Sequence, residues 1–180
     1  MNDNAFTLVA IRPATPSDAS AISAIYAPYV ERTAISFEYD APDEKEMSGR
    51  IEATLPNYPW LVAEQDGIVV GYAYLSPFKE RPAYRWAAET SIYVEWNHRQ
   101  SGVGRLLYSA LEQEAKSHGI LNLNACIAFR EDMDEHLPSG SIPFHQRVGY
   151  TKAAHFHQCG FKFGRWYDII WMEKIIGPHK

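Results

Sequence analysis

Apolar and polar residues alternate, or form short apolar runs, in seven segments of the chain, and these segments predict β-strands. The segments are residues 8–12, 60–64, 68–76, 84–95, 121–129, 151–161 and 166–174. Apolar residues with helical spacing predict three helices. The first runs from the start signal at Thr15–Asp18 to about residue 31, the second covers residues 43–54, and the third runs from Gly102 and Gly104 to about residue 119.

Turn and breaker residues refine this pattern. Pro28 falls inside the first helical segment, so a kink or break is expected there. Asp66–Gly67 predicts a tight turn between two strands, and Thr33–Tyr39 is expected to be extended. No repeat or low-complexity linker divides the chain, so we expect one domain of mixed α/β (α+β) class over residues 1–180, with residues 1–5 loose.

The segment from Glu89 to Glu112 combines a strand, a glycine-containing loop and a helix. Between strand and helix stands Arg99-x-x-Gly102-x-Gly104, whose glycines let backbone N–H groups approach an anion at the helix N-terminus. Two common phosphate loops do not match, because no Lys follows Gly104 and no G-x-G-x-x-G opens a βαβ unit. By itself a Gly-x-Gly pattern before a helix more often marks a tight turn than a ligand-binding loop.

Composition narrows the class of protein. The chain has 180 residues, is 46% hydrophobic and 22% charged, and carries a formal net charge of −5, which is typical of a globular protein and gives no general attraction to nucleic acid. No apolar run reaches the length of a membrane helix, and no signal peptide is recognised. Cys126 and Cys159 offer no disulfide framework; Cys126 is expected to be a buried strand residue. The cytoplasm is the expected compartment.

The chain resembles the GNAT acetyltransferases, whose pyrophosphate signature [RQ]-x-x-G-x-[GA] reads here Arg99-Gln-Ser-Gly102-Val-Gly104. The resemblance extends from Ile11–Asp18 to Phe144–Tyr150, where the fourth helix of that family ends. Within the superfamily, Lys79-x-Arg81-x-Ala-Tyr84-x-Trp-x-x-Glu89 resembles the phosphinothricin and methionine sulfoximine/sulfone acetyltransferases. The resemblance implies a central, mixed, mostly antiparallel twisted sheet of about seven strands flanked by about four helices. It also implies acetyl-CoA as co-substrate and a homodimer, with Phe161, Phe163 and Trp166 near the interface.

Carried over residue by residue, the resemblance implies a coenzyme site on the strand end, the glycine loop and the start of the fourth helix. The implied residues are Ile92, Tyr93, Val94, Arg99, Gln100, Ser101, Gly102, Val103, Gly104, Arg105 and Ser141. A backbone N–H near Tyr93 or Val94 would stabilise the developing oxyanion.

Two residues are candidates for proton transfer. Glu89 lies in a largely apolar stretch, where desolvation would raise its pKa; from the residues alone a surface role is equally plausible, and the resemblance favours a general base acting through water. His145 occupies the position from which phosphinothricin-type enzymes act as acid or auxiliary base. Tyr150 is an alternative acid or a packing residue.

An amino-acid substrate carries a carboxylate, which an arginine can hold with two hydrogen bonds. Arg81 matches the substrate loop implied by the resemblance, and Lys79 precedes it, although isolated charges of this kind are usually solvated. Phe37, Tyr84 and Tyr93 would line the pocket. The leading prediction is therefore N-acetylation of a small amino-acid-like amine. A polyamine, aminoglycoside or protein N-terminus as substrate, and a non-catalytic acyl-CoA sensor, are the alternatives.

Two further features leave alternatives open. Residues 130–141 are acidic and look like an insertion, with Pro138 where the family has Asn, so this loop is either a solvated surface loop or one that closes over the site. His155 and His157 fall on one face of a strand and could form a metal pair. Neither an HExxH motif nor zinc-type spacing accompanies them, so we expect no metal and a surface or dimer role.

Overall fold

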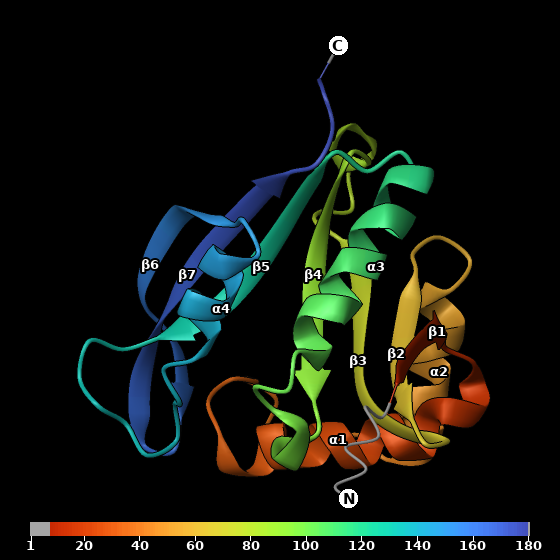
Figure 1. Cartoon of the computed structure of the whole chain (residues 1–180). Helices are drawn as coiled ribbons and strands as arrows, with labels where there is room; N and C mark the ends of the chain where they lie inside the picture. Colours follow the sequence, from red (N-terminus) through yellow and green to blue (C-terminus); the bar gives the residue numbers. More distant parts are fainter. Residues whose placement is uncertain (1–7, 180) are drawn as a thin grey trace, which may run out of the picture.

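The computed structural model describes residues 8–179, which form a seven-stranded sheet with helices on both faces (Figure 1). The loose segment expected at residues 1–5 lies outside the described range. The strand order is β1-β2-β3-β4-β5-β7-β6, and every neighbouring pair is antiparallel except β4 and β5. The strands are β1 (Val9–Pro13), β2 (Trp60–Gln65), β3 (Ile68–Pro77), β4 (Ala87–Val94), β5 (Asn122–Phe129), β6 (Thr151–Lys162) and β7 (Arg165–Ile175). The expected mixed, mostly antiparallel sheet is confirmed.

Four α-helices flank the sheet: α1 (Ala19–Arg32), α2 (Glu44–Thr54), α3 (Val103–Ser117) and α4 (Ser141–Arg147). Short 3-10 turns cover Pro16–Asp18, Pro82–Tyr84 and Trp96–His98. Figure 1 shows α3 and α4 on the near face of the sheet, with α1 and α2 behind it. None of the helices within residues 8–179 is both long and apolar enough to cross a membrane.

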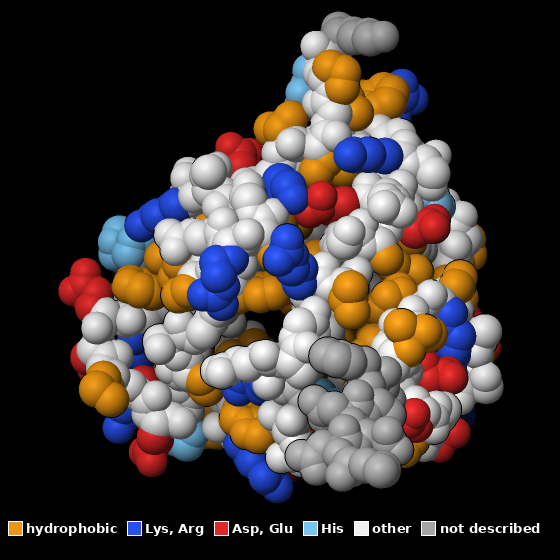
Figure 2. Space-filling model, in the orientation of Figure 1, with side chains coloured by type: hydrophobic (Ala, Val, Ile, Leu, Met, Phe, Trp, Pro, Cys, Tyr) orange, Lys and Arg blue, Asp and Glu red, His pale blue; other side chains and the backbone are white. Residues whose placement is uncertain are grey.

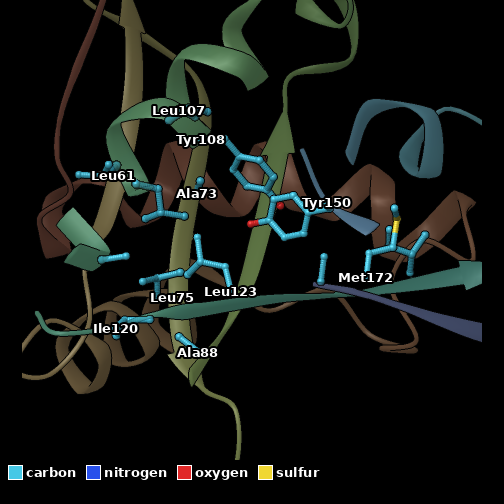
Figure 3. Close-up of a cluster of buried hydrophobic side chains, with 14 of the residues drawn as sticks. Leu61, Ala73, Leu75, Ala88, Leu107, Tyr108, Ile120, Leu123, Tyr150 and Met172 are labelled. Carbon is cyan, nitrogen blue, oxygen red and sulfur yellow. The ribbon is translucent and has the colours of Figure 1, made fainter. Parts of the chain in front are cut away.

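Each face of the sheet carries its own apolar core. Leu61 and Ala63 point into the cluster under α3, whereas Trp60 and Val62 of the same strand point into the cluster under α1 and α2. Side chains alternate along a strand, so a strand covered on both faces must be apolar throughout. Figure 3 shows the α3 cluster, in which Tyr108 of α3 lies beside Tyr150.

Capping residues explain where the helices begin. Asp43 accepts a hydrogen bond from the backbone N–H of Glu46 at 2.8 Å and starts α2. Asp18 accepts from the backbone N–H of Thr15 at 2.8 Å and is held by Arg12 through two hydrogen bonds of 2.8 and 2.9 Å. Gly102 starts α3 with a φ of 92°, a conformation that favours glycine.

The feature that positions the site is the separation of β4 from β5. These strands pair in parallel at only three positions, from Ala87↔Asn122 to Glu89↔Asn124. Beyond Glu89 they diverge, as Figure 1 shows, so Thr90–Val94 of β4 has no paired neighbour on that side. The backbone groups of this half-strand that do not pair with β3 are therefore available to a ligand, except the carbonyl of Val94, which accepts from the Tyr29 hydroxyl.

Four local expectations were wrong. Of the kink or break expected at Pro28, the break does not occur, since α1 continues to Arg32. The proline costs the hydrogen bond to the carbonyl of Ala24 and some local strain, which tertiary packing offsets. Residues 33–39 form a series of bends instead of an extended segment, and β4 begins at Ala87 because Pro82–Tyr84 forms a 3-10 turn. Cys126 is exposed: its face of β5 is not covered by a helix.

Candidate active site

A cavity of about 980 Å³ occupies the opening between β4 and β5. Residues of β4 and β5 form its walls, and α1, α3, α4 and the loop after α1 complete it. Figure 2 shows a hollow in the surface between α3 and α4, with Lys and Arg side chains above its rim. The volume lies at the upper end of the range for ligand sites, so the cavity has room for an extended cofactor and a small second substrate.

One end of the cavity is built to bind an anion. Gly102 and Gly104 lie at its wall where α3 begins, so the first N–H groups of the helix face this end. A Cβ added at Gly104 would lie 3.2 Å from the ring of Phe144, which is tighter than ordinary contact. Arg99 and Arg105 line the same end, and Arg99 stacks 4.4 Å from the ring centroid of Trp96. Cationic side chains and helix amides together suit a pyrophosphate.

Glu89 lies where β4 and β5 part. Its side chain is half-buried, lines the cavity, and accepts no hydrogen bond from any residue in the described range 8–179. Burial raises the pKa of this carboxyl above its usual value, and the nearby Lys79 ammonium opposes that shift. An unpaired carboxylate with a raised pKa, facing a cavity, is suited to accept a proton.

His145 and Tyr108 meet at the cavity wall beneath α4. The Nδ1 atom of His145 lies 2.8 Å from the carbonyl oxygen of Ser141, which only accepts, so Nδ1 carries the ring proton. Nε2 is then an acceptor, and the Tyr108 hydroxyl, 2.9 Å away, donates to it. Burial lowers the pKa of His145 to about 4, so this imidazole is neutral at pH 7. The proton available between this pair is therefore that of Tyr108.

The opposite end of the cavity is formed by the loop after α1. The Tyr26 hydroxyl lies 2.7 Å from Ser36 Oγ and donates to Glu38 at 2.9 Å. Arg50 donates two hydrogen bonds of 2.8 Å to Glu38, and the pKa of that carboxyl is lowered mainly by this pairing. Glu38 is therefore ionised and fixed in position at the cavity wall.

Lys162 holds this loop in place. Lys162 is 4% exposed, and its ammonium donates to the backbone carbonyls of Val30 at 2.6 Å, Thr33 at 3.0 Å and Ser36 at 2.7 Å. Desolvation lowers the pKa of Lys162. These contacts satisfy carbonyls at the end of α1 and in the next turn, so Lys162 fixes the loop that carries Phe37 and Glu38 to the cavity.

The model of the acetyltransferase (GNAT) domain family matches residues 11–171 of the chain. The chain belongs to the GNAT acetyltransferases. It is 34% identical over 171 residues to a phosphinothricin N-acetyltransferase of Streptomyces viridochromogenes, covering 94% of this chain and 90% of that protein. It is 35% identical over 166 residues to the L-amino acid N-acyltransferase MnaT of Escherichia coli K12, covering 92% of each.

Solved structures of GNAT enzymes agree with this assignment. A putative acetyltransferase from Salmonella typhimurium, determined with its cofactor acetyl-CoA, superposes with a TM-score of 0.86 at 34% identity and covers 95% of both chains. A phosphinothricin acetyltransferase from Sinorhizobium meliloti in complex with AcCoA gives 0.85 at 32% identity, covering 94% of this chain and 89% of that one. The GNAT fold expected from the sequence is thereby confirmed, and the chain is an acetyl-CoA-dependent N-acetyltransferase.

The structure brings most of the sequence-predicted GNAT site residues to one cavity. Those lining it are Phe37, Glu89, Ile92, Tyr93, Val94, Arg99, Gln100, Gly102, Gly104, Arg105, Ser141 and His145. Ser101 and Val103 do not line it. The Ser101 hydroxyl donates to the carbonyl of His98, and the Val103 side chain is buried in the core, so only their backbones can contribute.

Lys79, Arg81 and Tyr84 do not line the cavity. They belong to the exposed segment between β3 and β4, where the Lys79 ammonium lies 5.3 Å from the ring centroid of Phe78 and 6.0 Å from that of Trp171. Because the Lys79 ammonium opposes the rise in the pKa of Glu89, it lies near that carboxylate. The substrate-binding roles of these three residues stay predictions.

Sequence reasoning missed many of the residues that line the GNAT cavity. Four of them with ionisable side chains are Glu38, Tyr108, Cys126 and Arg147. Tyr108 was predicted to lie in a helix but was given no role, and Arg147 was interpreted as part of a helix ending. The spacing offered one signal for Tyr108, since it lies four residues after Gly104 and so shares its helix face. Partial desolvation and the Glu89 carboxylate raise the pKa of the Cys126 thiol to about 12, so it stays protonated.

The 130–141 loop is anchored at several points. The Asp134 side chain is 1% exposed and accepts from Arg165 at 3.0 Å, and the ring of His136 stacks 3.9 Å from that of Phe163. The backbone of His136 accepts from Ala34 at 2.8 Å. Only Gly140 and Ser141 of this loop line the large cavity. The loop therefore joins the β6–β7 turn to the end of α1 and is not wholly solvated.

Proposed function

We propose that this GNAT enzyme acetylates the amino group of a small amino-acid-like substrate such as phosphinothricin, methionine sulfone or methionine sulfoximine. The similarity to the Streptomyces phosphinothricin enzyme and to MnaT supports this substrate class. A methionine sulfoximine/methionine sulfone acetyltransferase of Salmonella typhimurium is 34% identical over 94% of this chain. The observation that carries the mechanism is Glu89, an unpaired, half-buried carboxylate at the point where β4 and β5 separate.

Acetyl-CoA fits the anion-binding end of the cavity, where α3 begins. The amides at the start of α3, with Arg99 and Arg105, would hold its pyrophosphate, and Arg147 adds a third positive charge to the lining. A side chain at Gly104 would encroach on Phe144, so the close approach of backbone and ligand depends on this glycine. When bound, acetyl-CoA supplies the acetyl group as a thioester. The unpaired backbone amides of Thr90–Val94 would polarise its carbonyl.

Glu89 takes a proton from the substrate amine. If the two groups are not in contact, the proton passes through a water between them. Its raised pKa makes it a stronger base than an ordinary glutamate. Tyr108 gives a proton to the departing thiolate. Neutral His145 accepts a hydrogen bond from the Tyr108 hydroxyl and so orients it. In this proposal Tyr108 and His145 share the predicted acid role, and the imidazole does not act alone.

Two carboxylates in the cavity wall support a second substrate class. Glu38 and Glu89 both line the cavity, and Arg50, the partner of Glu38, is not among the lining residues. A substrate with two amino groups, such as a polyamine, would place its second cation near Glu38. An amino acid would instead need Arg81 or Lys79 to approach from the β3–β4 segment and hold its carboxylate.

The deciding experiment is thiol release from acetyl-CoA by the purified protein. The acceptors are phosphinothricin, methionine sulfone, methionine sulfoximine, common amino acids, spermidine and a lysine peptide. Turnover restricted to the first three supports the proposal, whereas turnover with spermidine alone favours the polyamine class. Coenzyme binding without turnover on any acceptor overturns both. A homodimer and a cytoplasmic location are part of the proposal, and sedimentation at micromolar concentration tests the first.

A further inference from the structure

A cluster of three metal-binding side chains lies on β6 and β7, away from the residues that line the catalytic cavity. It consists of His155 and His157 on β6 and Asp168 on β7, and one ligand atom from each lies within 4.8 Å of the others. The two imidazole rings stack with centroids 4.2 Å apart, which confirms that they share one face of the strand. His155 Nε2 lies 2.7 Å from Asp168 Oδ2.

The register of the two strands explains why the third ligand was invisible in the sequence. His155 pairs with Ile170, and Phe156 with Ile169; the next pair is Gly160 with Tyr167. Residues 157–159 therefore stand opposite the single residue Asp168, in a β-bulge. Without this bulge and the hairpin, nothing along the chain relates Asp168 to the His-x-His pair, eleven residues before it.

Two of the three ligands, Asp168 and His155, are oriented by neighbouring groups. Asp168 Oδ1 accepts from the backbone N–H of Gln158 at 2.8 Å, which holds the carboxylate in the bulge, and Gln158 has the positive φ of 49°. The ring of Phe129 meets that of His155 edge-on, 5.5 Å away. The pKa of Asp168 is lowered, first by the Gln158 hydrogen bond, so the carboxylate is ionised at neutral pH. Outer contacts of this kind hold metal ligands in place.

We infer that His155, His157 and Asp168 form a binding site for a borderline divalent cation of the Zn²⁺ class. Two imidazoles and one carboxylate are a donor set that Zn²⁺, Co²⁺ and Ni²⁺ accept, whereas Mg²⁺ and Ca²⁺ prefer oxygen ligands alone. His157 is exposed, so the ion can enter from solvent and retain water in its remaining positions. The cation would join β6 to β7 across the bulge.

The positive charge of Lys152 repels a cation bound at this site, and this repulsion provides a test for specific binding. Its ammonium lies 3.4 Å from His155 Nδ1, so the ring proton now sits on Nε2 and faces Asp168. A cation bound at Nε2 moves that proton to Nδ1, and the exposed Lys152 side chain must turn away. Removing the ammonium should therefore strengthen metal binding, an effect that non-specific surface binding would not show.

The experiment is titration of the tag-free, metal-stripped full chain with Zn²⁺ by calorimetry, and with Co²⁺ by visible absorption. One Zn²⁺ per chain is expected, with binding weakened about tenfold or more in both His157→Ala and Asp168→Asn. Lys152→Gln should bind more tightly. His118→Ala, on an exposed histidine outside the cluster, and Cys159→Ser, beside the bulge, serve as controls and should bind like the parent chain.

Circular dichroism of each variant establishes that it is folded, and Mg²⁺ in place of Zn²⁺ should give no saturable binding. Unchanged Zn²⁺ affinity in the folded His157→Ala and Asp168→Asn variants would overturn the proposal. So would loss of binding in Cys159→Ser, because the ligand set would then be a different one. Acetyl transfer is not needed for any of these readouts, so the result is independent of the proposed substrate.

Discussion

Replacement of Glu89 by glutamine separates catalysis from stability more sharply than any other single change in this protein. The amide has nearly the same shape as the carboxylate but cannot accept a proton from an amine. A positioned general base contributes about 10²–10⁴-fold to rate, which corresponds to about 3–5 kcal/mol of activation free energy. We therefore expect kcat to fall by about 10²-fold or more, with acetyl-CoA affinity unchanged because Glu89 lies away from the glycine loop.

The same substitution should not destabilise the fold. Burial raises the folded-state pKa of Glu89 above its unfolded value, so the folded state binds more protons than the unfolded state between the two pKa values. Stability from this group is fully present below the unfolded pKa and is lost as the pH rises through the folded pKa. Above its folded-state pKa the parent chain bears the cost of a desolvated carboxylate, and Glu89→Gln does not. Its melting temperature should equal or exceed that of the parent, and the difference should shrink in acid.

The assay is thiol release from acetyl-CoA with the best acceptor, measured from pH 5 to 9 and paired with thermal melts at the same pH values. The kcat/KM of the parent should rise with pH as Glu89 ionises. This acid limb of the pH profile should be absent in the variant. Glu64→Gln is the matched control, since Glu64 pairs with Arg12 on β1, outside the cavity. A variant kcat within about threefold of the parent, or an intact acid limb, would remove Glu89 as the base.

Four further substitutions test the rest of the site. Tyr108→Phe should lower kcat with little change in acetyl-CoA affinity. It should also lower the free energy of unfolding by about 1–3 kcal/mol, because His145 Nε2 loses its hydrogen-bond donor. An unchanged kcat, measured by thiol release, would exclude Tyr108 as the acid. Gly104→Val should weaken acetyl-CoA binding in calorimetry, because its Cβ meets Phe144 at 3.2 Å; full affinity would contradict the assigned loop. Lys162→Met leaves three backbone carbonyls without their donor, so it should lower the free energy of unfolding by about 2–4 kcal/mol in urea melts. It should also raise the KM of the acceptor, and Lys162→Arg should rescue both effects in part. An unaltered KM would mean that the loop after α1 keeps its position without Lys162. Arg81→Ala should raise the KM of an amino-acid acceptor and leave that of spermidine unchanged; equal effects on both would show that Arg81 does not bind a carboxylate.

Local patterns were sufficient for the elements and for the anion-binding loop. The apolar runs at 60–64 and 68–76 correspond to β2 and β3 within one residue at each end, because both strands are apolar on both faces and end at turn residues. Gly102 was recognisable because the start of α3 demands a positive φ that few other residues tolerate. Glu89 stood out as an acid in an apolar strand.

Where the sequence was wrong, the competing influence was tertiary. Pro28 did not break α1, because the core on which Tyr26 and Tyr29 pack outweighs one missing hydrogen bond. Cys126 lies on a strand of apolar pattern, yet its face of β5 opens to the cavity. Burial of a strand residue depends on what covers it, and periodicity along one segment cannot report that.

The sequence by itself determined the order of helices and strands, the glycine loop and the GNAT family, because these depend on residues close together in the chain. Only the tertiary structure decided what the site contains. Tyr108 and His145 are 37 positions apart and meet only when α4 packs on α3, and Lys162 reaches the end of α1 across 132 positions. The parting of β4 from β5 created the cavity, and the bulge in β6 brought Asp168 to the two histidines. Contacts of this kind depend on packing between distant segments, for which single-chain patterns carry no signal.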